Sequence, residues 1–145
     1  MNKHKHMHFS TPLCLLLGAA IASTGAIAGT PRPEGARAII ISPAHGDTVD
    51  QNFMVRFGLQ GMGVAPAGCD MPNTGHHHLL IDNETLPPPD EPMGGDIQHF
   101  GGGQTQTTLT LPPGEHTLLL ILGDKDHIPH SPPVMSEQIK VTVAE

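Results

Sequence analysis

The stretch Asn52–Gln60, NFMVRFGLQ, decides the fold class, because apolar and polar side chains alternate along it. In an extended strand one face would carry the apolar side chains of Phe53, Val55, Phe57 and Leu59. This alternation is typical of a strand with one face on a core. Beyond residue 28, no stretch of ten residues shows a helical apolar repeat free of proline and glycine. We therefore expect an all-β protein.

Further short segments with strand character are separated by turns rich in proline and glycine. The predicted strands besides Asn52–Gln60 are Ala38–Ser42, His76–Asp82, Asp96–Phe100, Gln104–Leu111, His116–Leu122 and Val134–Ala144. About seven strands is the number expected of an immunoglobulin-like antiparallel β-sandwich. A closed barrel, which usually has eight evenly spaced strands, is the alternative. We place a single β-sandwich domain at residues 38–145.

The N-terminal residues 1–28 have the pattern of a secretory signal peptide. Lys3 and Lys5 precede the apolar stretch Leu13–Ile21, and Ala26–Ala28 forms a small-x-small cleavage site. The apolar stretch is too short and too interrupted to span a membrane, and no later segment is a candidate. We expect cleavage after Ala28, a flexible leader at residues 29–37, and a periplasmic or secreted protein with no membrane span in its mature form.

Composition excludes several classes of function. The 145 residues suffice for one domain, and the 14 acidic against 7 basic residues give a formal charge of −7, which disfavours nucleic-acid binding. Four Phe and no Trp or Tyr leave few rings for stacking on bases or sugars. With Cys14 inside the signal peptide, Cys69 has no partner for an internal disulfide.

Histidine is the residue type that points to a function. After residue 28 the chain contains His45, His76, His77, His78, His99, His116, His127 and His130. In an antiparallel sandwich alternate loops gather at the same end. Three of these loops adjoin the triplet at 76–78, His99, and the pair His127 and His130. The order of the strands therefore predicts six histidines at one end, with His45 and His116 at the other.

His76 and His78 point to the same face of a strand, with Cα atoms about 6.5–7 Å apart. Two such imidazoles can bind one metal ion, and His99, His127 and His130 are the candidates for its remaining ligands. Zinc and copper(II) take three or four nitrogen ligands in sites of this kind. The resulting hypothesis is a site made of His76, His78, His99, His127 and His130.

Other residues are open to two interpretations. Met62, Met71 and Cys69 lie in neighbouring loops and would add soft donors for copper(I), although Cys69 is more simply an inert, partly buried thiol. We expect His77 to pack between the layers, because it points away from His76 and His78. His116 is expected to anchor a turn and His45 to be solvated.

Motifs of catalysis are scarce. The sequence has no Gly-x-Ser-x-Gly elbow, no His-Glu-x-x-His motif and no phosphate-binding loop. We therefore expect no enzyme, with a dismutase-like copper or zinc enzyme as a minor alternative.

Several long motifs resemble an uncharacterised bacterial family of exported proteins, domain of unknown function 4399. They are GLQGMGVAPAG at 58–68, TGHHHLLID at 74–82, HFGGGQT at 99–105, TTLTLPPG at 107–114 and HIPH at 127–130. The resemblance covers most of the chain after residue 28, and it implies an exported small β domain without assigning an activity. Cys69 and Asp70 stand at positions where the family is not expected to have a cysteine.

The leading hypothesis is a periplasmic or secreted protein that binds a transition-metal ion, copper before zinc, for sequestration or delivery. Its affinity is expected to fall below about pH 6, because protonated imidazole does not bind metal. The alternative is a non-enzymatic module of the cell envelope, in which the histidines are structural and an envelope protein is the partner.

Overall fold

The computed structural model describes residues 29–145, and every regular element in this range is a β-strand. The expectation of an all-β fold is therefore confirmed. The signal peptide predicted at residues 1–28 lies outside the described residues. Within the described range, no helix has the length and apolarity needed to cross a membrane.

The strands form two sheets. The smaller sheet has the order β1 (Arg37–Ser42), β3 (Asn52–Gln60), β7 (Gln106–Thr110), with antiparallel pairing throughout. The larger sheet contains six strands: β2 (Thr48–Val49), β9 (Ile139–Val143), β8 (Gly114–Gly123), β5 (Thr74–Ile81), β4 (Gly63–Val64) and β6 (Gln98–His99). Its short strands β2 and β4 pair in parallel with β9 and β5, and its other pairings are antiparallel.

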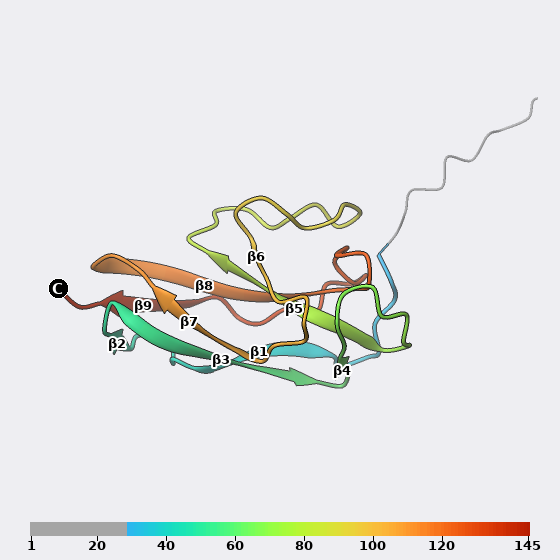
Figure 1. Ribbon diagram of the computed structural model, residues 1–145, viewed down its shortest axis with the longest axis horizontal. Coiled ribbons are helices and arrows are strands. Elements are labelled where there is room, and N and C mark those ends of the chain that lie inside the picture. Colours follow the sequence, from blue (N-terminus) through green and yellow to red (C-terminus); the bar gives the residue numbers. More distant parts are fainter. Residues whose placement is uncertain (1–28) are drawn as a thin grey trace, which may run out of the picture.

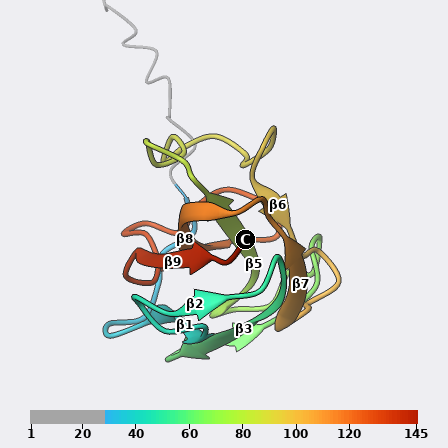
Figure 2. The same ribbon diagram turned by 90° about the vertical axis from the view of Figure 1, so that its left-hand side faces the viewer.

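The two sheets pack face to face as a sandwich. Viewed along the strands, β8 and β9 lie in one layer and β1 and β3 in the other (Figure 2). The core between them takes Phe53, Val55 and Phe57 from β3, as the alternation in this strand predicts. The opposite layer contributes Leu79, Leu118, Leu120, Ile139, Val141 and Val143. Burial of these apolar side chains is the main stabilising contribution to the fold.

The strand boundaries follow the local sequence closely where a strand is long. β3 has the predicted bounds, whereas β8 extends over Gly114–Gly123 and β6 is only Gln98–His99. The two-residue strands β2 and β4 were not predicted, because two residues are too few to show an alternation.

The position of β6 determines where His99 lies. β6 corresponds to the fourth of the seven strands predicted from the sequence. In an immunoglobulin constant-type sandwich the fourth strand belongs to the same sheet as the first and second strands. Here β6 pairs instead with β5 in the opposite sheet, and His99 stands directly across from His78. The long connection of residues 82–97 that leads to β6 runs over the outer side of the larger sheet (Figure 1, yellow).

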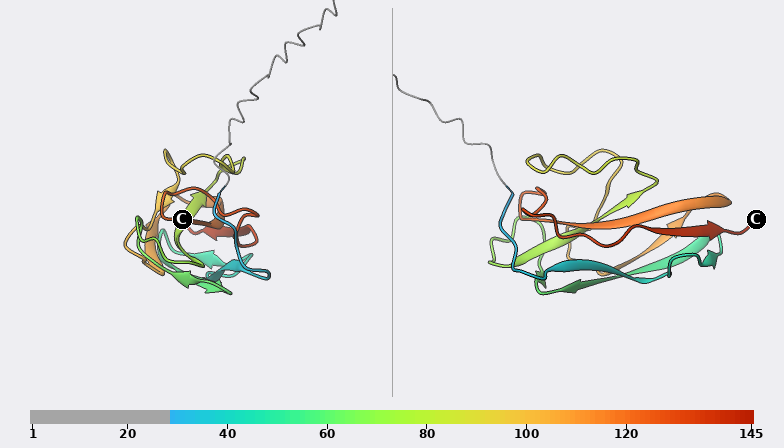
Figure 3. Two further views of the ribbon diagram at one scale, coloured as in Figure 1. Left: turned by 90° about the vertical axis from the view of Figure 1, so that its right-hand side faces the viewer. Right: turned by 180° about the vertical axis from the view of Figure 1, so that it is seen from behind.

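Residues 29–37, predicted as a leader, run beside the loop that follows β8 (Figure 3). Pro31 forms a bridge with Ser131, and the Ser131 amide donates to the Thr30 carbonyl over 3.0 Å. Arg37 is already the first residue of β1. The mobility of this segment stays a prediction.

Candidate metal centre

Four histidines from three separate segments converge on the outer side of the larger sheet. His76 and His78 come from β5, His99 from β6, and His127 from the loop between β8 and β9. One ring nitrogen of each lies within 4.8 Å of a nitrogen of every other. The centroids of the four rings are 4.6–5.9 Å apart. We call these four residues the histidine cluster.

β5 supplies two members of the cluster because successive side chains alternate between its faces. His76 and His78 face outward, whereas His77 points into the sandwich and packs on Phe57, with ring centroids 5.3 Å apart. His77 is fully buried, so the predicted packing between the layers is confirmed. His99 joins the outward pair through the antiparallel register of β6 with His78.

A tight turn brings His127 to the cluster. The Asp124 Oδ1 atom accepts hydrogen bonds from the amides of Asp126 and Ile128 at 2.9 and 3.1 Å. The His127 amide donates to the Asp124 carbonyl over 3.0 Å, and His127 has a left-handed φ of +67°. A non-glycine residue in this conformation costs roughly 1 kcal/mol, so the surrounding hydrogen bonds must hold it.

Asp124 is the organising residue of this turn. Its side chain is only 6% exposed, and its Oδ2 atom accepts a hydrogen bond from Thr30 Oγ1 at 2.7 Å. Burial alone would raise the pKa of Asp124, but the hydrogen bonds from Thr30, Asp126 and Ile128 outweigh it and lower the pKa below its ordinary value. A buried carboxylate is therefore present close to His76, whose positive form it would favour.

Two glycines leave room for the rings of the cluster. A Cβ atom on Gly101 would lie 2.2 Å from His99 Cε1, and one on Gly123 would lie 2.6 Å from His78 Cε1. Both distances are shorter than van der Waals contact allows, so any side chain at either position would displace a ring.

Burial keeps the inner members of the cluster uncharged. The pKa of His76 is lowered to about 4, chiefly by burial and then by its neighbours His127 and His99. The pKa of His78 is lowered to about 3, again chiefly by burial and then by His76 and His99. Burial, followed by His127, also lowers the pKa of the more exposed His99. These three rings are therefore neutral at pH 7, and neutral imidazole is the form that binds metal.

The inner rings also have nitrogens without partners. Among residues 29–145, His76 Nδ1 and both ring nitrogens of His78 are buried and form no hydrogen bond. The remaining nitrogen of His76, Nε2, lies 3.2 Å from His127 Nδ1, and one of the two donates to the other. A metal ion would supply a partner for one nitrogen of each ring, although the packed ring of His77 also has two buried nitrogens without a partner.

The spacing of the donor atoms suits one ion after a small adjustment. With metal–nitrogen bonds of about 2.0–2.1 Å, tetrahedral ligands are separated by roughly 3.3–3.4 Å. The donors here lie within 4.8 Å of one another, so the cluster would have to contract. His99 is exposed and His127 half-buried, so these two rings are the ones free to move toward His76 and His78.

His130, the fifth predicted ligand, is not brought into the cluster. It is buried, with Nδ1 donating to the Leu122 carbonyl over 3.4 Å. Its Cε1 atom adjoins the inward side of Gly75, 2.9 Å from where a Cβ would stand. The loop after β8 wraps around the end of that strand, so His127 reaches the outer side of the sheet and His130 the inner side.

The two histidines expected at the opposite end have structural roles. His116 donates from Nδ1 to Asp82 Oδ2 at 2.7 Å and from Nε2 to the Pro112 carbonyl at 2.9 Å, so it anchors its turn as predicted. The hydrogen bond to Asp82 is the main cause of its raised pKa. His45 is exposed, and its Nδ1 atom accepts from the Lys140 amide at 3.2 Å.

Among the described residues, the Cys69 thiol is not one of the donor atoms that converge at the histidine cluster. Cys69 is a half-buried free thiol, Met62 packs in an inner apolar group, and Met71 is 58% exposed. Met93, to which no sequence pattern points, borders the cluster. Its amide donates to the His127 carbonyl over 2.9 Å. Met93 lies in a proline- and glycine-rich connection, where no periodic pattern marks it.

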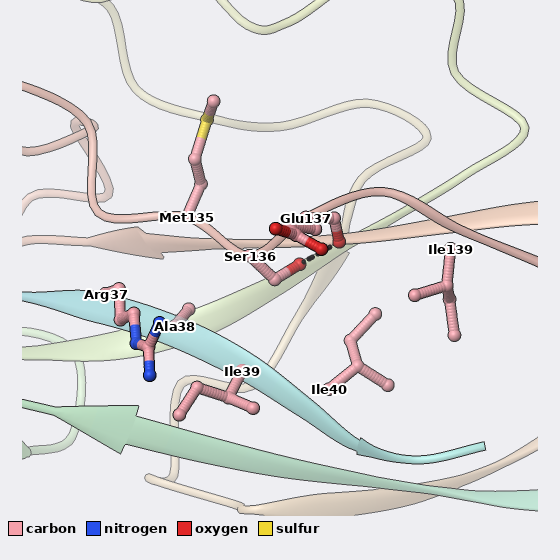
Figure 4. A pocket seen from close by; sticks show the side chains of 8 residues that line it. All are labelled: Arg37, Ala38, Ile39, Ile40, Met135, Ser136, Glu137 and Ile139. Atoms are coloured by element: carbon pink, nitrogen blue, oxygen red, sulfur yellow. Dashed lines mark hydrogen bonds between the residues drawn. The ribbon is translucent and has the colours of Figure 1, made fainter. Parts of the chain in front are cut away.

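A separate groove lies between β1 and the segment that precedes β9 (Figure 4). Ile40 and Ile139 contribute apolar surface, while Ser136 Oγ donates to the Glu137 carbonyl at 2.8 Å. Arg37, at one end of the groove, donates to Gln60 Oε1 at 2.9 Å. No member of the histidine cluster lines this groove. The groove is therefore separate from the candidate metal centre.

Comparison with known proteins gives one assignment. The model of the family described as Domain of unknown function (DUF4399) matches residues 55–144. The chain belongs to this family. The match includes every member of the histidine cluster and excludes the first two strands, β1 and β2. No curated protein and no solved structure gives a significant match.

Proposed function

We propose that this DUF4399 protein binds one transition-metal ion, copper before zinc, through His76, His78, His99 and His127. The observation that carries the proposal is the convergence of four imidazoles from three chain segments to within 4.8 Å. Here the inner rings keep buried nitrogens that form no hydrogen bond with any of residues 29–145.

The choice of copper rests on the donor set. All four candidate ligands are imidazoles, which suit copper and zinc, and copper(II) binds most tightly in the general order of divalent metals. No carboxylate or thiol from the described residues is part of the group. Such a site would carry the full charge of its ion, which the buried carboxylate of Asp124 would partly offset.

The surroundings favour entry of a cation. The connection that covers the outer side of the sheet has no lysine or arginine, and its acidic residues are Asp82, Glu84, Asp90, Glu91 and Asp96. Negative charge of this kind attracts cations at long range. Since the sequence also predicts export, we propose that the protein sequesters or delivers the ion in the periplasm or outside the cell.

Titration of the tag-free protein from residue 29 onward, with copper(II) and separately with zinc, tests the proposal. We expect one tight equivalent and a rise in melting temperature, because an ion that binds only the native state stabilises it. The variant with His76→Ala and His78→Ala should lose both effects. His130→Ala, whose ring lies outside the histidine cluster, is the matched control and should still bind.

The opposite result would favour the alternative of an envelope module with structural histidines. No stoichiometric binding by the parent protein, or binding unchanged in the double variant, would contradict the metal proposal. In that case replacing the histidines should alter stability without any response of the melting temperature to metal.

A further inference from the structure

Met93 lies against two members of the histidine cluster. Its Cε atom is 2.9 Å from the position of a Cβ on Gly123, and His78 Nδ1 is 3.0 Å from the same position. The thioether methyl and this edge of His78 therefore both border the space above Gly123. On the other side, the Met93 amide holds the carbonyl of His127 at 2.9 Å.

Met93 is also the residue that attaches the covering connection to the sheet. It is only 7% exposed, whereas its neighbours Pro92 and Gly94 are exposed. It packs in an apolar group with Leu80, Leu119 and Ile121 on the outer side of β5 and β8. The Met93 side chain is thus held at low exposure between apolar side chains, with its terminal methyl near the buried ring of His78.

The nature of the donor matters for the choice of ion. Thioether sulfur is a soft ligand that suits copper(I), whereas imidazole alone serves copper and zinc alike. In blue-copper sites a weak, long methionine contact lies beside nitrogen ligands and tunes the copper. Leucine could fill the same apolar volume as Met93, but it would supply no donor.

We infer that Met93 is a further donor to the ion held by the histidine cluster, and that its thioether makes the site selective for copper(I) over zinc. The inference rests on the proposed function, because it assigns a role to Met93 only at a metal site. It also assigns a purpose to the connection of residues 82–97, which brings Met93 beside His78 and His127.

The test compares the parent protein with Met93→Leu, a replacement of similar volume. Copper(I) affinity is measured anaerobically by competition with a chromogenic copper(I) chelator, and zinc affinity with a zinc-sensitive dye. For Met93→Leu we expect at least a tenfold loss of copper(I) affinity and less than a threefold change for zinc. X-ray absorption of the copper(I) protein should show a sulfur scatterer that Met93→Leu lacks.

Zinc binding by the same variant shows that the histidine cluster has folded. Met71→Leu, at an exposed methionine, is the matched control and should bind both ions as the parent does. Equal losses for both ions, or no loss for either, would overturn the assignment of Met93 and leave it a packing residue. Failure of the parent protein to bind any ion would instead overturn the proposed function, so the two failures are distinguishable.

Discussion

The two faces of β5 carry the same residue type at the same depth and in entirely different surroundings. His76, His77 and His78 are all fully buried. On the outer face, His76 and His78 meet two further imidazoles, with ring centroids 4.9–5.9 Å away. On the inner face, His77 meets Phe57. Burial of a histidine is therefore no indication of a site, whereas convergence of several is.

The contrast has a simple physical basis. The inner face of β5 packs on the other sheet, which supplies apolar side chains to the core. The outer face is covered by irregular segments, and these are free to place polar side chains over the sheet. A metal site built on this outer face combines two rigid ligands from a strand with two from more adjustable segments.

The largest expected effect separates the two faces directly. His78→Leu removes a ligand, so copper(II) affinity should fall by more than the roughly 10–100-fold typical of losing a residue that only supports a ligand. His77→Leu, one residue away, should change the affinity less than threefold. Calorimetric titration of both variants checks this, and equal losses would show that the two faces are not functionally distinct.

The second prediction concerns the glycine beneath His78. In Gly123→Ala the new methyl would stand 2.6 Å from His78 Cε1, so the ring must move. We expect about a 10–100-fold loss of metal affinity and a destabilisation of about 1–3 kcal/mol from overpacking. Gly94→Ala, where a Cβ would meet nothing within 4 Å, is the control. Parent-like metal binding by Gly123→Ala would contradict the geometry of the cluster.

The third prediction is a dependence of the metal-free protein on acid. Because the native pKa values of His76 and His78 are about 4 and about 3, below the ordinary 6.5, the unfolded chain binds more protons throughout this interval. The contribution of these two rings to stability should therefore be constant above about pH 6.5 and fall as the pH drops from there toward 3. Urea unfolding across this range measures it, and the double variant of His76 and His78 should show a shallower decline.

The fourth prediction tests the support of His127. Thr30→Val removes the 2.7 Å hydrogen bond to the buried carboxylate of Asp124, which should cost about 1.5–3 kcal/mol of stability. Loosening of the turn that carries His127 should also weaken metal binding severalfold. Thr85→Val, at an exposed threonine, is the control. Unchanged stability and affinity would show that the turn holds its shape without Thr30.

The smallest expected effect lies far from the cluster and has the opposite dependence on pH. The pKa of His116 is raised by its bond to Asp82, so the pair stabilises the native state below about pH 6.5 and loses this contribution as the pH rises through the raised pKa. His116→Gln should cost at most about 1 kcal/mol at pH 5.5, typical of an exposed pair, and less at pH 9. A larger cost at pH 9 than at pH 5.5 would contradict this interpretation.

Local sequence accounts for much of the fold. The alternation in Asn52–Gln60 predicts β3, and the apolar run ending at Leu122 predicts β8. Both predictions are local, because successive side chains of a strand point to opposite faces. The same rule separates His77 from His76 and His78. The short strands β2 and β4 are different, because two residues carry no pattern and each strand is defined only by its parallel pairing, β2 with the distant β9 and β4 with β5.

Periodicity along the chain was sufficient to establish an all-β sandwich and to put His76 and His78 on one face. Contacts between distant segments determined which other side chains reach the cluster. Pairing of β6 with β5 brought His99 opposite His78, and the wrapping of the loop after β8 sent His127 and His130 to opposite sides of the sheet. Met93 reached the cluster through packing of the 82–97 connection. Strand pairing, loop path and packing of this kind depend on the free energy of the whole folded molecule, which no short stretch of residues encodes.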